Sequence, residues 1–361
     1  MSLLRGPSSR RLLVALGTLA GLIAVGRAEP APEPCWAYGY PDPPAPGEKA
    51  VVPPLAATLQ DRLIPEPGPG FTVPGHVAGS AATYSRRQIR DWSNVVDWFP
   101  GDHPPMPAIM AHGPASRGPI SVGCAYCHLP NGRGRPENAP VAGLSVRYIL
   151  LQLGDFRKGN RVSADPRKPN TNLMAQLARE MSDDEMKASA AYFASLKWTP
   201  WTRVVETALV PRTRIEGNLF LATGAERTEP IAGRIIEVPE NEEQSEHWRN
   251  PRSGFVAYVP VGSVRAGEIL VTTGGAHPEN GRLVPGRTLA CTSCHGPDLM
   301  GIADVPGLAG RSPSYLVRQL YDLQRGTRHG ASAVPMGPVV ANLTDDDMVA
   351  IAAYVASRRT P

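Results

Sequence analysis

Apolar residues recur at helical spacing in two segments that each begin at a serine. Ser145 precedes the mainly apolar segment 148–153, and Ser312, followed by Pro313, precedes the mainly apolar segment 315–320. A serine hydroxyl before the first helical residue accepts a hydrogen bond from a free backbone amide, and proline is favoured at the first helical position. The pattern therefore predicts a helix in each segment.

A second pair of segments opens with a capping box or a close variant of one. Ser182-x-x-Glu185 and Thr344-x-x-Asp347 place an acid three residues after the capping hydroxyl. Apolar residues then recur at helical spacing, namely Ala190, Phe193 and Leu196 in one segment and Ile351, Tyr354 and Val355 in the other. We predict two final helices ending in the bases Lys197 and Arg358-Arg359, and shorter first helices at 107–112 and 265–273.

These helical segments belong to an internal repeat. An offset of 167 maps one series of residues onto identical residues: Pro130 to Pro297, Gly134 to Gly301, Gly143 to Gly310, Ser145 to Ser312, Tyr148 to Tyr315, Gln152 to Gln319 and Gly159 to Gly326. After Gly159 the first copy has five extra residues, and the offset becomes 162. The chain is therefore predicted to contain a duplicated domain of about a hundred residues, at 96–200 and 262–361.

Between the two copies the sequence changes from helical spacing of apolar residues to short strand-like runs. Residues 203–206, 234–238 and 254–259 are β-branched or aromatic runs, broken by proline, glycine and acidic residues. We predict a small β-rich insert at 201–261. Its acidic cluster is interpreted as a solvated loop, with a docking surface for a redox partner as the alternative: Glu242, Glu243 and Glu246 beside His247.

Composition and charge narrow the functional class. The chain has 361 residues, 42% of them hydrophobic, with a formal charge of +4. Residues 1–28 hold four arginines and no acid, so cleavage there leaves 37 − 4 = 33 basic residues against 33 acidic ones. A neutral mature chain lacks the basic surface that nucleic-acid binding needs, and we expect no nucleic-acid partner.

The N-terminus has the pattern of an export signal. A basic start is followed by an apolar stretch at 12–25 and by small residues at Gly26 and Ala28, which predicts a signal peptide at 1–28. A retained N-terminal anchor is the alternative, and Ser9-Arg10-Arg11 weakly resembles a twin-arginine signal. The working chain is expected to be exported, in the periplasm, with membrane association through an uncleaved N-terminus or through a partner.

Four of the five cysteines lie in two identical motifs. Cys124-x-x-Cys127-His128 and Cys291-x-x-Cys294-His295 have the C-x-x-C-H pattern of c-type haem attachment. On one helical turn both thiols and the imidazole project to one side, so the sulfurs can bond the haem vinyl groups while the histidine binds iron. The alternatives are a zinc site, a redox dithiol or local disulfides, none of which needs a histidine after the second cysteine. We predict two covalently attached c-type haems.

The repeat also selects candidates for the second iron ligand. The offset of 162 maps Met174 onto Met336, and both are predicted to lie in loops that could place a thioether across the haem from His128 and His295. The alternative is core packing. His329 competes with Met336, but its repeat partner Val162 cannot bind iron. The other methionines considered are assigned to packing or excluded: Met181, Met186, Met300 and Met348.

Each proximal histidine should donate its other ring N–H to a backbone carbonyl, which fixes the tautomer. The candidate acceptor for His295 is the carbonyl of Pro306, and its repeat equivalent for His128 is Ala139.

The sequence resembles a known family, the tandem-domain two-haem cytochromes c of the cytochrome c4 type. The resemblance rests on the C-x-x-C-H motifs, the glycine six residues after each histidine, the repeated methionine and the acidic helix starts. It implies a mainly α-helical fold of two class I cytochrome c domains. It also implies histidine and methionine ligation of both irons, and outer-sphere electron transfer with no substrate at the metal.

Two segments depart from a minimal member of this family: the insert and a proline-rich extension at 29–95. Residues 30–75 hold 13 of the 39 prolines, which indicates a tether or strap. Cys35 lies there and is interpreted as an inert or intermolecular thiol; an alternative iron ligand is the other reading. Residues 85–99 add Trp92, Trp98 and Phe99 after a candidate cap at Ser85, and these aromatics are expected to seal a small core rather than cover the first haem.

The sequence thus predicts an exported two-haem cytochrome that transfers single electrons between redox partner proteins, such as a periplasmic dehydrogenase, an oxidase or a respiratory complex. No catalytic residue is assigned. The competing hypothesis is a two-haem oxidoreductase, such as a peroxidase or a thiosulfate-dehydrogenase-like enzyme, in which one iron has an open or displaceable axial position.

Overall fold

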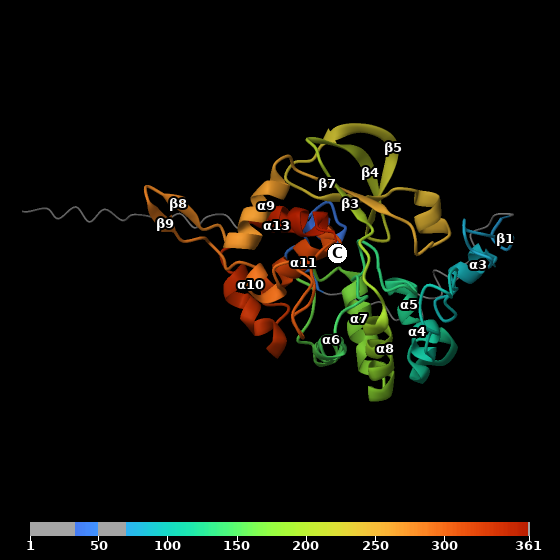
Figure 1. Cartoon of the computed structure of the whole chain (residues 1–361). Coiled ribbons are helices and arrows are strands. Elements are labelled where there is room, and N and C mark those ends of the chain that lie inside the picture. Colours follow the sequence, from blue (N-terminus) through green and yellow to red (C-terminus); the bar gives the residue numbers. More distant parts are fainter. Residues whose placement is uncertain (1–32, 50–69, 360–361) are drawn as a thin grey trace, which may run out of the picture. The chain divides into compact units, whose positions relative to one another are not determined.

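Two sets of helices correspond to the two copies of the repeat in the computed structural model, which describes residues 33–49 and 70–359 (Figure 1). The first set is α4 (Ala108–His112), α5 (Cys124–His128), α6 (Val146–Lys158), α7 (Pro169–Glu180) and α8 (Asp183–Ser195), with the 3-10 turn η1 (Ala115–Ile120). The second is α9 (Ser263–Thr273), α10 (Thr292–His295), α11 (Pro313–Gln324), α12 (Gly337–Val340) and α13 (Asp345–Ser357), with the 3-10 turn η3 (Ala331–Met336). The predicted signal peptide lies outside the described residues.

The four predicted helix caps are confirmed. The hydroxyl of Ser145 accepts a hydrogen bond from the amide of Tyr148 at the start of α6, and Ser312 does the same at the start of α11. Ser182 and Thr344 each form a complete capping box, at α8 and α13. The predicted C-terminal ends are wrong by two residues in the first copy and by one or two in the second: α8 ends at Ser195 and α13 at Ser357, so the bases lie just beyond the last turn.

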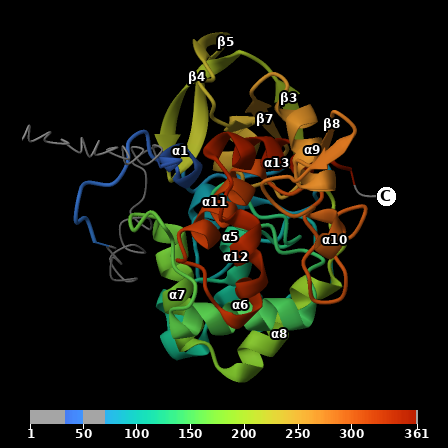
Figure 2. The ribbon, with the colours of Figure 1, turned by 90° about the vertical axis from the view of Figure 1, so that its left-hand side faces the viewer.

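Each copy has its own hydrophobic cluster. In the first copy α6 packs against α7 and α8, and in the second α13 packs against α9 and α11 (Figure 2). The contact between α9 and α13 requires a glycine, because a Cβ at Gly267 would lie 1.9 Å from the carbonyl oxygen of Ala350. The first copy has only the short helix α4 against α8. Among described residues, no helix is both long enough and apolar enough to cross a membrane.

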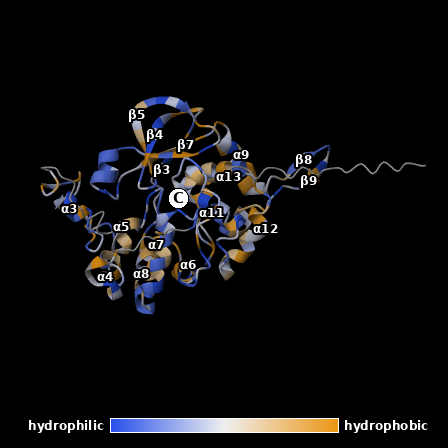
Figure 3. Cartoon of the chain, turned by 180° about the vertical axis from the view of Figure 1, so that it is seen from behind, coloured by the Kyte–Doolittle hydropathy of each residue, from blue (hydrophilic) through white to orange (hydrophobic). Residues whose placement is uncertain are grey.

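In chain order, five strands separate the two sets of helices. They are β3 (Thr202–Glu206), β4 (Leu209–Glu216), β5 (Leu219–Pro230), β6 (Ile236–Pro239) and β7 (Phe255–Val259), with the π-helical turn η2 (Glu243–His247) before β7. Strand β7 pairs in parallel with β3 and antiparallel with β6, while β4 and β5 form a separate hairpin. Most of the outer half of β5 is exposed and hydrophilic (Figure 3).

The remaining elements are short. The described part of the extension contains α1 (Cys35–Tyr38), the strand pair β1 (Pro74–Gly75) and β2 (Tyr84–Ser85), and α3 (Arg86–Ile89), which Ser85 caps as predicted. Strands β8 (His277–Glu279) and β9 (Arg282–Val284) form a hairpin between α9 and α10. Trp98 and Phe99 pack with Val77 and Ile89 in one small cluster, as predicted. Trp92 instead packs with Tyr126 of the first C-x-x-C-H motif, in a cluster that Cys127 also contacts.

Candidate haem-binding sites

The first motif forms helix α5, which begins at Cys124 and ends at His128. In the second copy α10 runs from Thr292 to His295, with Cys291 as its N-cap residue. In both copies the residue that follows the helix has a positive φ, +62° at Leu129 and +87° at Gly296. The cysteines and the histidine of each motif therefore lie on one short turn of chain, as covalent attachment requires.

Both histidines have one ring nitrogen held by a backbone carbonyl. The distance from Nδ1 of His128 to the carbonyl oxygen of Ala139 is 2.8 Å, and that from Nδ1 of His295 to the carbonyl oxygen of Pro306 is also 2.8 Å. Both contacts are the predicted ones. Burial lowers the pKa of each histidine, so the rings are neutral near pH 7 and Nε2 keeps the lone pair that a metal needs.

A glycine six residues after each histidine makes this contact possible. The amide of Gly134 donates to the carbonyl of His128 at 2.9 Å, and the amide of Gly301 donates to that of His295 at 2.8 Å. A Cβ at Gly134 would lie 2.5 Å from the carbonyl oxygen of Ala139, which is the acceptor for His128. Glycine thus lets the chain fold back over the histidine at the correct distance.

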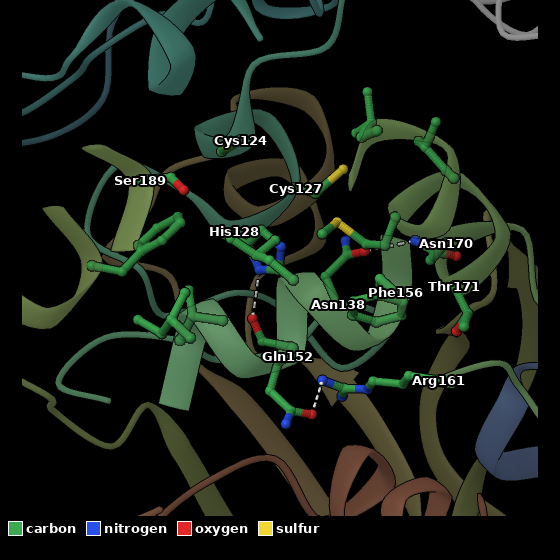
Figure 4. Close-up of a pocket in the computed structure, with 18 of the residues that line it drawn as sticks. Cys124, Cys127, His128, Asn138, Gln152, Phe156, Arg161, Asn170, Thr171 and Ser189 are labelled. Carbon is green, nitrogen blue, oxygen red and sulfur yellow. Dashed lines mark hydrogen bonds between the residues drawn. The ribbon is translucent and has the colours of Figure 1, made fainter. Parts of the chain in front are cut away.

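The first motif opens into a mainly apolar cavity. Cys124, Cys127 and His128 line it on one side, together with apolar side chains from α6 and α7 (Figure 4). Helix α6 contributes Ile149, Leu153 and Phe156, and α7 contributes Leu173 and Leu177; Leu144, before α6, and Phe193, from α8, complete this apolar lining. Such a lining fits the faces of a porphyrin and limits contact with water.

Met174 lines the same cavity as His128, but it does not lie in a loop. It lies in the second turn of helix α7, which begins at Pro169, so the prediction of a loop at this position is wrong. Proline at a first helical position favours the helix rather than a loop. Met181, which was assigned to packing, belongs to the first hydrophobic cluster and also lines this cavity.

In the second copy Met336 ends the 3-10 turn η3 and packs at the edge of the cluster around α13. The competing His329 is exposed, and its Nδ1 lies 3.0 Å from the carbonyl oxygen of Gly326. Met186 and Met348 are buried in the two clusters, as predicted for core residues.

The cysteines do not support the alternative sites. All five are free thiols, which excludes local disulfides in the structure. Burial raises the pKa of Cys124 to about 12 and that of Cys291 to about 11, so both thiols are protonated near pH 7 in the free chain and are poorly suited to dithiol exchange. No group of three or more His, Cys, Asp or Glu residues that could hold a metal ion occurs in the described part of the chain. Two thiols beside a carbonyl-held neutral histidine and an apolar cavity fit a covalently bound haem.

The acidic cluster forms the helical turn η2 and its N-cap residue Glu242 rather than a loop. Its acids pair with arginines, although Glu243 stays exposed: Arg86 with Glu243, Arg135 with Glu246 and Arg214 with Glu242. Cys35 is buried, with its Sγ 3.5 Å from the carbonyl oxygen of Pro41, and it does not line the first cavity.

The sequence reasoning missed the polar end of the first cavity. Gln152 and Arg161 line it, joined by a hydrogen bond of 2.9 Å (Figure 4). The signal was available in the repeat, since the offset of 167 maps Arg161 onto Arg328 as well as Gln152 onto Gln319.

Comparison with known proteins assigns both copies to one family. The cytochrome c family model matches residues 120–197 and 283–359. The thiosulfate dehydrogenase electron acceptor of Stutzerimonas stutzeri (strain A1501) is 35% identical over 243 residues, covering 66% of this chain and 80% of that protein. Cytochrome c4 of Pseudomonas aeruginosa is 26% identical over 253 residues, covering 68% and 90%.

Among solved structures, the thiosulfate dehydrogenase of Marichromatium purpuratum is 27% identical, with a TM-score of 0.42, and the match covers 68% of this chain and 38% of that one. The family match in both copies and the length over which the relatives align agree with the tandem repeat. The chain therefore belongs to the cytochrome c family, as a tandem-domain member of the cytochrome c4 type with two covalently bound c-type haems.

Proposed function

We propose that this protein is an exported electron carrier that passes single electrons between redox partner proteins in the periplasm. The observation that carries the proposal is the pair of equivalent sites, each with a neutral, carbonyl-held histidine. When bound, each haem supplies an iron that alternates between the ferric and ferrous states. Two such centres on one chain suit the relay of electrons between proteins.

Each attachment site is assigned to one motif. Cys124 and Cys127 would form the thioethers of the first haem and His128 would bind its iron, while Cys291, Cys294 and His295 would do so in the second copy. Ala139 and Pro306 hold the histidine rings in one orientation, because each carbonyl accepts the Nδ1 proton. This contact leaves Nε2 free for the metal.

Met174 and Met336 are proposed as the second axial ligands. Met174 is supported by its place in the lining of the first cavity with His128, and Met336 by its repeat relationship to Met174. A thioether ligand would raise the reduction potential of the bound iron and would close it to oxygen and peroxide, while the apolar lining would exclude water. Both effects favour electron transfer over catalysis at the metal.

The name of one relative suggests a partner. The Stutzerimonas protein is named as an electron acceptor for thiosulfate dehydrogenase, so an enzyme that oxidises a sulfur compound is a candidate donor for this chain. The competing function is a two-haem oxidoreductase with one open or displaceable axial position. The proposed boundaries remain a signal peptide at 1–28, an extension at 29–95, cytochrome domains at 96–200 and 262–361, and an insert at 201–261.

The visible spectrum of the oxidised protein tests the axial ligands. Two methionine-ligated haems should each give the weak far-red charge-transfer band, and Met174→Ala or Met336→Ala should remove the band from one haem. Met300→Ala is the matched control, since Met300 is partly exposed near the second motif and is not a proposed ligand. A high-spin signal from the wild-type protein would favour the enzyme, and an unchanged spectrum in either alanine variant would remove that methionine from the site.

A further inference from the structure

Residues 33–42 of the N-terminal extension, which we call the strap, contact the chain just before helix α7. The hydroxyl of Tyr40 donates to the carbonyl of Arg167 at 2.8 Å, and the guanidinium of Arg167 lies 4.0 Å from the centroid of the Tyr40 ring. The same guanidinium donates to the carbonyl of Asp42 at 2.8 Å. Three contacts therefore join the strap to one arginine, which lies two residues before the first residue of α7.

The strap also holds Lys168, which is the N-cap residue of α7. Nζ of Lys168 donates to the carbonyl of Tyr38 at 3.2 Å, and this lysine is 1% exposed. Its side chain makes no capping hydrogen bond to the first turn of α7, so the helix lacks the usual N-terminal cap. Contacts outside the helix therefore have to fix where α7 starts, and the strap supplies them at both residues before Pro169.

The strap is itself anchored on the second copy and on the insert. Tyr38 is 1% exposed, its hydroxyl donates to Oδ1 of Asp322 in α11 at 2.7 Å, and helix α1 lies beside α11 (Figure 2). Gly39 has a φ of +83°, and a Cβ there would lie 2.6 Å from the carbonyl oxygen of Asn218, in the turn between β4 and β5. Because these anchors do not belong to the first copy, the strap is a fixed support for the start of α7.

The strap and the residues that bind it are both additional to the repeat. Fourteen residues separate Gly159 from Met174 in the first copy, whereas nine separate Gly326 from Met336 in the second. The longer segment contains both residues that bind the strap, and it leads into the twelve-residue helix α7. The shorter segment leads into the 3-10 turn η3, which ends at Met336. A segment from outside the repeat and an insertion within it thus meet at the entry to the helix that carries Met174.

The start of α7 determines where Met174 lies. Met174 follows Lys168 by six residues, in the second turn of α7, and it lines the first haem cavity. The other end of α7 is held by α6, because Arg157 donates to the carbonyls of Ala178 and Met181 at 3.0 and 2.6 Å. A helix is a rigid element over two turns, so a shift of its start also moves Met174 relative to the cavity.

We propose that the strap positions the axial ligand of the first haem, with Tyr40 and Lys168 as positioning residues for Met174. The inference rests on the electron-carrier function and the axial ligands proposed above. The bonds of the strap hold α7 where the thioether occupies the axial position, and they keep that position closed to outside ligands. Without these bonds the helix start can move, and an outside ligand competes more easily with the methionine. The strap acts on the first copy alone, so the two haems respond differently.

Imidazole titration of the oxidised two-haem protein tests this inference. At a methionine-ligated haem imidazole binds only by displacing the thioether, so loss of the far-red band measures how firmly the methionine is held. In a Met336→Ala background the remaining band belongs to the first haem alone. Tyr40→Ala and Lys168→Leu in that background should each raise the apparent affinity for imidazole by about fivefold, which is the equilibrium effect of losing one ordinary hydrogen bond. Neither replacement side chain can bind iron.

The matched control is Tyr84→Ala. Tyr84 is another half-buried tyrosine of the extension: its hydroxyl donates to the carbonyl of Asp97 at 3.0 Å, and its ring centroid lies 4.8 Å from that of Trp98. This variant should leave the imidazole affinity unchanged. Affinities in Tyr40→Ala and Lys168→Leu that stay within the change of this control would overturn the proposal.

Failure of the proposed function gives a different result. If Met174 is not the axial ligand, the band of the first haem survives Met174→Ala, whatever the strap variants do. If Met174→Ala removes that band and the strap variants match the control, only the positioning role fails.

Hydrogen exchange of the same variants separates positioning from general destabilisation. The amide of Asn172, in the first turn of α7, donates to the carbonyl of Lys168 at 3.3 Å. In Tyr40→Ala this amide should exchange about fivefold faster, while the amides of α6 keep their wild-type rates. Tyr40→Phe keeps the ring over Arg167, should recover part of both effects, and serves if the alanine variant fails to mature. Equal acceleration in α6 and α7 would show that the strap stabilises the whole domain and would overturn the positioning role.

Discussion

The two C-x-x-C-H motifs have the same local structure and different surroundings. Tyr126, in the first motif, is 8% exposed: the ring of Trp92 lies 4.8 Å from its ring, and the guanidinium of Arg249 lies 4.3 Å from its ring centroid. Its repeat equivalent, Ser293, is exposed. Val122 is 1% exposed, whereas its equivalent Leu289 is 59% exposed.

The cover of the first motif comes from outside the repeat. Trp92 belongs to the extension, and Arg249 follows the turn η2 between the copies. Asn131 is bound in the same way, since its side chain donates to the carbonyl of Pro251 at 2.7 Å. The motif thus fixes the geometry of the histidine, while the added segments determine how far the motif is exposed to solvent.

The largest expected effect is on the aromatic cover of the first motif. Trp92→Ala should lower the free energy of unfolding by about 3–5 kcal/mol, because it removes a buried ring that packs on Tyr126. The matched control is Ser293→Ala, at the exposed equivalent of Tyr126, which should change it by less than about 0.5 kcal/mol. Denaturant unfolding of both variants measures the difference, and similar values would show that the first motif is not covered as described.

A second effect separates Arg135 from its repeat equivalent Ile302. Arg135 is 3% exposed, lies 3.1 Å from Glu137 and pairs with Glu246, whereas Ile302 is 53% exposed. Arg135→Ala should cost about 2–3 kcal/mol, since it leaves a buried carboxylate unpaired. Ile302→Ala should be nearly neutral. Chemical denaturation compares the two, and an equal loss would contradict the difference in environment.

The helix caps should behave alike in both copies. Ser182→Ala and Thr344→Ala each remove a complete capping box, and each should cost about 1 kcal/mol. Thermal unfolding of the two variants checks this equality. Loss in only one of them would mean that the copies differ in local structure as well as in cover.

The smallest expected effect is a pH dependence of stability that comes from His103, which has no histidine equivalent in the second copy. Burial lowers the pKa of His103, but its contacts with Asp97 at 3.3 Å and with the carbonyl of Pro104 outweigh burial and hold the pKa above its usual value. Because the folded pKa is raised, the stabilisation is complete below the unfolded value of about 6.5 and is lost as the pH rises through the folded pKa. His103→Gln should flatten this loss, which we expect to be within about 1 kcal/mol. Unfolding free energies measured from pH 5 to 9 in both proteins test it.

Local signals predicted the local structure well. The capping residues, the proximal histidine contacts and the first helices depend on a few neighbouring residues, and each was readable from the spacing along the chain. The loop predicted around Met174 was wrong, because Pro169 suggested a loop but is the first residue of helix α7. Hairpin β4–β5 was missed because its charged residues hide the alternation of apolar positions.

Contacts between distant segments could not be predicted in the same way. The pairing of Arg135 with Glu246 and the packing of Trp92 on Tyr126 join parts of the chain that no short motif relates. Arg161 and Arg328 are a partial exception. The repeat offset of 167 relates the two residues, but it does not predict that they form an antiparallel bridge between the copies.

The parallel pairing of β3 with β7 fixes the distance between the end of the first copy and the start of the second. Strand β3 follows the last helix of the first copy and β7 precedes the first helix of the second, so five paired residues on each strand join the exit of one copy to the entry of the other. The separation of those two points is then independent of how much chain runs between them. The exposed end of the β4–β5 hairpin could therefore be shortened or lengthened while the spacing of the redox centres stays constant, whereas Leu219 and Leu221 at its base pack in the first hydrophobic cluster and must be kept.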